Sequence, residues 1–299
     1  MNTRAPGGKA RAYGINKKRD KGFYIVSRIT MTLGIVGIVF PILYILSLSV
    51  RTKETMYNAY AFLVPKAATL ENYKNAWNYA STNLNVSFVE MFRNSLIASV
   101  SSIVIAIVFS ALASFSFSNF FFKGKELLFT ILIGSFIIPA QVLLIPLFFI
   151  LKNVGFIDTY LAIIIPYIGI LIPIAIMILR SFFEEIPKEM KEAAKIDGAS
   201  EMTIFLRVIL PLSKAALASC TILLSLETWN EFIFALVFLQ NPKLQTIPVA
   251  IAKIAGGKFL LPVGTYSASI MITVIPIIIV FVAFQKWFIS GITMGAVKG

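Results

Sequence analysis

Two carboxylates, Glu227 and Glu231, stand inside a stretch from Ala215 to about Phe234 that carries no other charge. If Ala215 marks the inner edge of a span, a helical rise of about 1.5 Å per residue places Glu227 roughly 18 Å into a membrane. The spacing predicts that Glu231 follows one turn later on the same helical face, where the two charges would repel. An ionisable group at such depth should face a protein interior or a watery cavity.

The pair has two possible uses, and both stay open at this point. The side chains could contact a solute that crosses the membrane. Alternatively, Glu231 already lies in the outer headgroup zone and a neighbouring subunit locks Glu227 in place.

Most catalytic chemistry is excluded by residue type. The chain has no His and one Cys, Cys220, which rules out zinc sites of the His or Cys type and nucleophiles that depend on His. A phosphate-binding P-loop needs Ser or Thr directly after Gly-Lys. The Gly-Lys pairs here are followed by Ala10, Glu126 and Phe259. We therefore expect no enzyme activity, no metal site and no cofactor in this chain, and any energy must come from another chain or an ion gradient.

The elements that position these carboxylates are membrane spans. The chain is 58% hydrophobic, with 26 Phe and a mean hydropathy of +0.85, which is more than soluble domains carry. Crossing a hydrocarbon core of about 30 Å takes roughly 20 helical residues. Six stretches qualify: Ile29 to Val50, Asn94 to Phe122, Leu127 to Leu151, Thr159 to Leu179, Ala215 to about Phe234, and Phe259 to Gln285. The sequence predicts an all-α polytopic membrane protein with six transmembrane helices.

Basic residues in the loops predict the orientation, because cytoplasmic loops hold the excess of Lys and Arg. With six spans both termini share one side, and that side carries 18 of the 27 Lys and Arg residues. Both termini should therefore be cytoplasmic. The net charge of +13 is explained by these membrane flanks and by contact with anionic lipid, so no nucleic-acid partner is expected.

Small residues form a stripe along the second span, and prolines interrupt several others. The stripe has two possible uses: close packing of a neighbouring helix or a polar lining for a solute path. Prolines inside spans kink them and free backbone carbonyls. The stripe comprises Ala98, Ser102, Ala106, Ser110, Ser114 and Ser118, and the prolines are Pro41, Pro139, Pro146, Pro166, Pro173 and Pro276.

A polar segment between the fourth and fifth spans has the pattern of a helix, a turn and a second helix. Lys188 to Ile196 are helix formers, Asp197-Gly198 is a turn signal, and Ser200 can cap the next helix. Ala193 and Ala194 make one side of the first helix narrow and smooth. A smooth helix with Glu192 and Asp197 at its rim suits insertion into a groove of another protein. Its many acidic residues argue against docking on anionic lipid.

The segment "EAAKIDGASEMTIFLRVILPL" resembles the EAA loop of permeases from binding-protein-dependent ABC importers. The matching residues are Glu192, Ala193, Ala194, Gly198, Leu210 and Pro211, with Val208 where that family usually has Ile. "LETWNEFIFALVFL" and the ending "WFISGITMGAVKG" are similar to sugar permeases of the maltose-transporter type. The resemblance covers roughly residues 20 to 299.

This resemblance implies one half of a type I importer in a bacterial-type cell membrane. A second, usually non-identical permease would complete the pathway. A dimer of ATPase subunits would bind ATP and Mg, and an extracytoplasmic sugar-binding protein would dock on the other side. The implied organisation is a basic arm (1–22), then a permease domain (23–299) with a first helix (23–50), an extracytoplasmic segment (51–92), five core helices (93–290), a coupling loop (183–210) and a cytoplasmic tail (291–299).

The resemblance also implies roles for individual residues. Glu192 would make the polar contact to the ATPase, Ala193 and Ala194 the close-packed face, and Gly198 the turn, with Asp197, Leu210 and Pro211 in the same coupling segment. The implied tail contact to the ATPase is Met294, Gly295, Val297, Lys298 and Gly299. The implied loop toward the binding protein holds Gly256, Gly257 and Lys258, and the translocation path holds Gln141, Glu227, Asn230 and Glu231.

Two other classes of protein remain as alternatives. A secondary transporter would use Glu227 and Glu231 as its proton or cation site, but a single set of six helices and a docking segment do not suit it. An intramembrane enzyme would have to work with this carboxylate pair alone.

Overall fold

The computed structural model describes residues 17–57, 67–256 and 261–296. In this part of the chain four helices are long and apolar enough to cross a membrane. They are Gly22–Ser49 within α1 (Lys17–Ser49), α3 (Phe88–Asn119), α6 (Leu161–Glu185) and Val263–Ala283 within α13 (Val263–Ala296). Two bent helix pairs raise the number to six if each pair counts as one span. The predicted all-α membrane fold is confirmed.

The third predicted span, Leu127 to Leu151, is broken. It consists of α4 (Lys125–Gly134), η1 (Ser135–Ile137), η2 (Ala140–Leu143) and α5 (Leu144–Asn153), and the two halves are bent by 89°. The break is at Pro139, which cannot donate a backbone hydrogen bond and forces the residue before it out of helical geometry. Ile138 accordingly has φ −81° and ψ 114°. Pro146 lies in the first turn of α5, where a proline is tolerated.

The fifth predicted span is shorter than expected. It begins after a bend of 75° that separates α8 (Glu201–Ile204), η3 (Phe205–Ile209) and α9 (Leu210–Leu212) from α10 (Lys214–Asn230). The expected end near Phe234 is wrong, because α10 stops at Asn230 and Phe234 belongs to a separate helix, α11 (Ile233–Phe238). Glu231, between the two helices, has an extended backbone with φ −66° and ψ 127°.

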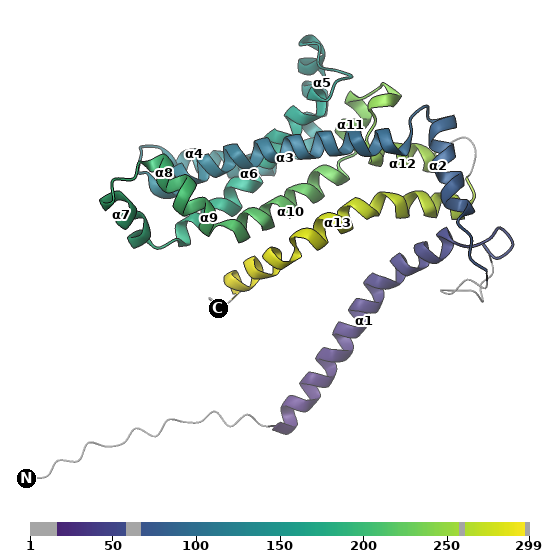
Figure 1. Cartoon of the computed structure of the whole chain (residues 1–299), viewed down its shortest axis with the longest axis horizontal. Coiled ribbons are helices and arrows are strands. Elements are labelled where there is room, and N and C mark those ends of the chain that lie inside the picture. The colour runs from purple at the N-terminus through teal and green to yellow at the C-terminus, as the bar shows by residue number, and fades with distance from the viewer. Residues whose placement is uncertain (1–16, 58–66, 257–260, 297–299) are drawn as a thin grey trace, which may run out of the picture.

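The long helices α3, α6, α10 and α13 run side by side (Figure 1). At one end of this group lie α7 (Lys188–Ile196) and α8, and at the opposite end lie α2 (Glu71–Asn83) and α12 (Ile247–Gly256). Helix α1 reaches the other helices only at its C-terminal end, where Ser47, Leu48 and Ser49 are buried. The rest of α1 leaves its apolar side chains exposed.

The small-residue stripe of α3 packs against α6. Ser110 Oγ donates to the Ile172 backbone oxygen at 3.2 Å, and Ser114 Oγ donates to that of Ile176 at 3.3 Å. Ala98, Ser102 and Ala106 are likewise buried. Of the two uses considered for this stripe, the structure supports close helix packing.

Two buried amides tie the loops to the helices at the end that carries α2 and α12. Asn94 Nδ2 donates to the backbone oxygens of Lys243 and Gln245 at 2.8 and 3.0 Å, and Asn94 Oδ1 accepts from the Tyr160 hydroxyl at 2.6 Å. Asn72 Nδ2 donates to the backbone oxygens of Ser49 and Arg51 at 3.1 and 2.8 Å. Buried, hydrogen-bonded amides of this kind hold loops in one arrangement.

Candidate functional site

The turn after α7 is a Schellman motif, the hydrogen-bonded helix ending in which a residue with positive φ closes the last turn. Gly198 is that residue, with φ +81°. Its N–H donates to the Lys195 oxygen at 3.0 Å, and the Ala199 N–H donates to the Ala194 oxygen at 3.0 Å. Glycine suits the position because an L side chain is strained at such a φ. The sequence Ala-Lys-Ile-Asp-Gly-Ala therefore encodes a sharp stop for α7.

The two alanines of α7 lie in different environments. Ala194 and Ala199 pack against the apolar core formed by α3, α6 and α10 together with Ile204, Phe205 and Ile209, which supplies the apolar contact that usually accompanies a Schellman motif. Ala193 and Glu192 face outward, and Ile196 is 86% exposed. The outward face of α7 thus offers a small side chain between a carboxylate and an apolar side chain.

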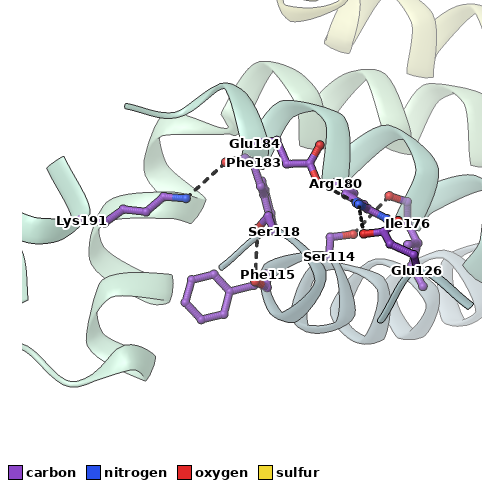
Figure 2. A network of polar contacts seen from close by, with 9 residues as sticks. All are labelled: Ser114, Phe115, Ser118, Glu126, Ile176, Arg180, Phe183, Glu184 and Lys191. Atoms are coloured by element: carbon purple, nitrogen blue, oxygen red, sulfur yellow. Dashed lines mark hydrogen bonds and ion pairs between the residues drawn. The ribbon is translucent and has the colours of Figure 1, made fainter. Parts of the chain in front are cut away.

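Polar contacts hold α7 on the bundle (Figure 2). Lys191 Nζ donates to Oδ1 of Asn119, the last residue of α3, at 2.5 Å. It also donates to the backbone oxygen of Phe183 in α6 at 3.4 Å. Partial burial lowers the pKa of Lys191, and the neighbouring charge of Lys188 adds to this effect. Lys195 pairs with Glu201 across the turn at 2.6 Å. The helix is therefore attached to the ends of α3 and α6 and to α8.

A second cluster at the same end joins α4 to α6. Arg180 donates to Glu126 Oε1 at 3.0 Å and to Glu184 Oε1 at 2.7 Å, and its guanidinium carbon lies 4.0 Å from the centre of the Phe129 ring. Figure 2 shows Arg180 between the two carboxylates. A planar guanidinium that bridges two carboxylates and stacks on a ring holds its partners in a defined geometry. The start of α4 is thus fixed against the last turns of α6.

A cavity of about 380 Å³ lies between α6, α10 and the break in the third span. The four residues assigned to the translocation path come from two separate parts of the sequence, around 141 and 227–231, and all four lie on its wall. Tyr167 and Thr228 are further polar residues of the wall, and sequence reasoning missed both. A tyrosine inside an apolar, proline-containing span has no local signal of function, and only the fold places it here. The polar wall residues are Gln141, Tyr167, Glu227, Thr228, Asn230 and Glu231.

Glu227 and Glu231 both line the cavity, but α10 ends at Asn230, between them. Both carboxylate oxygens of Glu231 are occupied: Oε1 accepts from the Phe234 N–H at 2.7 Å, and Oε2 accepts from the Ala235 N–H at 3.2 Å and the Tyr167 hydroxyl at 2.6 Å. Free N–H groups at a helix start attract a carboxylate, so the chain leaves α10 and begins α11. Glu231 is therefore held by its own chain.

Glu227 stays exposed on the cavity wall. Within the described part of the chain it makes no hydrogen bond or ion pair. Beside it, Asn230 Nδ2 donates to the Leu226 backbone oxygen at 2.9 Å. The described residues also contain no group of three His, Cys, Asp or Glu side chains that could hold a metal ion. The cavity wall thus presents one carboxylate, Glu227, that has no partner among the described residues.

The other predicted site residues lie away from the cavity or outside the described residues. Leu210 and Pro211 are the first two residues of α9, just before the bend that leads into α10. Gly256 ends α12, and Met294 and Gly295 belong to the last turns of α13. The remaining predicted residues, Gly257, Lys258, Val297, Lys298 and Gly299, lie outside the described residues.

Comparison with known proteins agrees with this architecture. Residues 102–294 match the family model described as "Binding-protein-dependent transport system inner membrane component". The chain is 33% identical over 267 residues to a probable ABC transporter permease, YurM, of Bacillus subtilis, covering 89% of this chain and 86% of that protein. It is 33% identical to the trehalose/maltose transport system permease MalG of Thermococcus litoralis, covering 92% and 98%.

A solved structure has the same fold. It belongs to a bacterial ABC transporter involved in the import of the acidic polysaccharide alginate, with a TM-score of 0.78, 24% identity and coverage of 93% of this chain and 100% of that one. The matched family segment, residues 102–294, begins in the middle of α3 and ends just before the end of α13. It includes α7 and the cavity. The chain therefore belongs to the family of inner-membrane components of binding-protein-dependent transport systems.

Proposed function

We propose that this chain is a non-catalytic permease subunit of an ATP-driven importer that moves a sugar or oligosaccharide across the cell membrane. Curated relatives carry trehalose/maltose and arabinooligosaccharide names, at 33% identity in both cases. The sequence has no P-loop, so hydrolysis would belong to a separate ATPase dimer that binds ATP and Mg. A second permease would form the other wall of the pathway.

One observation carries the transport role: two helix breaks meet at the same cavity. Gln141 follows the break at Pro139, and Glu231 occupies the break between α10 and α11. Irregular backbone at membrane depth is tolerated where it is buried in protein or lines a watery cavity, and transporters use broken helices at their binding sites. Gln141, Glu227 and Asn230 would then line the path, with Glu231 holding its shape.

The coupling role belongs to α7 in this proposal. Its outward face presents Glu192 and Ala193 next to Ile196, while Ala194 and Lys191 attach its inner face to the bundle. A helix that is attached to the bundle by its inner face and exposed on its outward face can enter a groove of the ATPase. It would then pass a movement of the ATPase on to α3 and α6. Both termini and α7 would be cytoplasmic. Met294, Gly295 and residues 297–299 would add a second contact to the ATPase.

The opposite end would receive an extracytoplasmic sugar-binding protein. A related solved structure, with a TM-score of 0.65, is of an alginate ABC transporter in complex with a periplasmic protein. In this chain α2, α12 and the segment with Gly256, Gly257 and Lys258 would face that partner.

The test is reconstitution of the complete transporter in proteoliposomes with its ATPase, second permease and binding protein. We expect sugar uptake that needs ATP and stops when the ATPase carries an inactivating substitution. Uptake that continues with the inactive ATPase, or that collapses with an ionophore alone, would overturn the proposal. The ion-driven alternative is also weakened by the structure, because a proton or cation site at Glu231 would compete with its three hydrogen-bond donors.

A further inference from the structure

The charge of the cavity wall points to the class of solute that can pass. The stretches that build it, 127–151, 159–179 and 215–242, contain no Lys or Arg, and none of the described wall residues is basic. Two wall residues are carboxylates, Glu227 and Glu231. The part of the pathway supplied by this chain is therefore acidic and carries no countercharge of its own.

The two carboxylates contribute differently to this field. Glu231 accepts hydrogen bonds from two backbone N–H groups and the Tyr167 hydroxyl, so its charge is partly balanced by fixed dipoles. Glu227 is exposed to the cavity and makes no hydrogen bond or ion pair among the described residues. A sugar hydroxyl can donate a charge-assisted hydrogen bond to such a carboxylate. A carboxylate or sulfonate on the solute would instead face a bare like charge in a medium less polar than water.

We propose that Glu227 is a charge-selecting residue, which admits neutral and cationic sugars and rejects anionic ones. This inference rests on the proposed transport function. The fold itself does not decide the matter, because a solved transporter with this fold imports an acidic polysaccharide. Gln141, Thr228 and Asn230 add uncharged donors and acceptors to the same wall, which suits hydroxyl groups.

The field in the cavity can be measured without knowing the sugar. Ala140, a small half-buried residue of the wall, is replaced by cysteine, and buried Cys220 is replaced by serine. The purified transporter, with its ATPase and second permease, is treated with a trimethylammonium or a sulfonate methanethiosulfonate reagent. Mass spectrometry of the peptide with the introduced thiol gives the rate of modification by each reagent. The ratio of the cationic to the anionic rate is then divided by the same ratio measured for a free thiol in solution.

We expect the cationic reagent to be favoured by about 10-fold or more, since a nearby unpaired charge acts on the two reagents in opposite directions. Glu227→Gln should remove most of this preference. Glu71→Gln, which removes an exposed carboxylate at the start of α2, is the matched control and should leave the ratio unchanged.

Three results would overturn the proposal. An unchanged ratio after Glu227→Gln would mean that the second permease neutralises Glu227 or that Glu227 does not face the cavity. A preference for the anionic reagent would show that the assembled pathway is basic. No reaction of the thiol at Ala140 or of a second one at Ile233, also on the wall, would mean that solutes do not enter the cavity. ATP-dependent uptake in the same preparation tests the proposed function separately.

Discussion

Replacing Gly198 with alanine tests the link between the turn after α7 and transport. Gly198 has φ +81°, and no heavy atom lies within 4 Å of the position that a Cβ would take. The cost is therefore one of backbone conformation, about 1–2 kcal/mol for an L residue in the left-handed region. An energy of this size changes the equilibrium between formed and opened turn by roughly 5- to 30-fold.

The opened turn should loosen the whole of α7. A helix of nine residues is too short to persist alone, because isolated helices below about 12–15 residues are marginal in water. Hydrogen exchange should therefore accelerate at the Gly198 and Ala199 amides, which form the Schellman bonds, and along α7. Overall stability should fall by no more than the strain itself, about 1–2 kcal/mol, because the core does not change. In the reconstituted transporter, sugar uptake per ATP hydrolysed should fall.

Gly155 provides a matched control. It has φ +74° with open space around it, and it closes the same hydrogen-bond pattern after α5, from Gly155 N to Lys152 O at 3.1 Å and from Phe156 N to Leu151 O at 2.8 Å. Gly155→Ala should carry a similar strain without uncoupling. Gly198→Asn should be milder than Gly198→Ala, because Asn tolerates positive φ. Equal loss of uptake per ATP in the two alanine variants, or unchanged exchange in Gly198→Ala, would refute the reasoning.

Three further changes test contacts elsewhere in the fold. Gly264→Ala would place a Cβ against Met56 Cε and 2.7 Å from Asn72 Nδ2 and should cost about 1–3 kcal/mol; a thermal midpoint that does not fall would show that Met56 and Asn72 move aside freely. Asn94→Leu leaves the buried hydrogen-bonding partners of Asn94 unpaired and should lower the free energy of unfolding by at least about 1–3 kcal/mol. A neutral effect would mean that water replaces the amide. The effects of Arg180→Lys and Glu126→Gln on the free energy of unfolding should be non-additive in a double-mutant cycle, with a coupling energy of about 0.5–1 kcal/mol. Strict additivity would show that this ion pair does not contribute to stability.

The spans could be predicted from the sequence because the cost of burying a charge in lipid is large and local. Charge-free gaps mark α1, α3, α6 and α13 with no need for tertiary information. The breaks in the spans are harder to predict, because a proline breaks one helix and is accommodated inside another. Pro139 separates two halves bent by 89°, whereas Pro166 and Pro173 remain inside α6. The difference depends on packing that one sequence does not display, such as the contacts of α6 with α3 and α10.

The polar segment after α6 was more predictable, because its signals are local. The helix over 188–196, the glycine turn and the Ser200 cap were all expected, and Ser200 Oγ accepts from the Thr203 N–H at 3.2 Å. What spacing could not reveal is the division between Ala193 and Ala194. Both are small helix formers, and only the position of the core beside α7 makes Ala194 an inward residue.

The fate of the two carboxylates shows why spacing alone misjudged the cavity. Both carboxylates line the cavity, but α10 ends at Asn230 and Glu231 accepts hydrogen bonds from the N–H groups that open α11. These hydrogen bonds fix Glu231, whereas Glu227 has no partner among the described residues. A single helix end thus decides which carboxylate is held by its own chain and which stays exposed to the cavity. Exchanging either carboxylate for its amide should therefore have different effects: Glu231→Gln should loosen α11 and its contact to Tyr167, and Glu227→Gln should change the field in the cavity while the fold is kept.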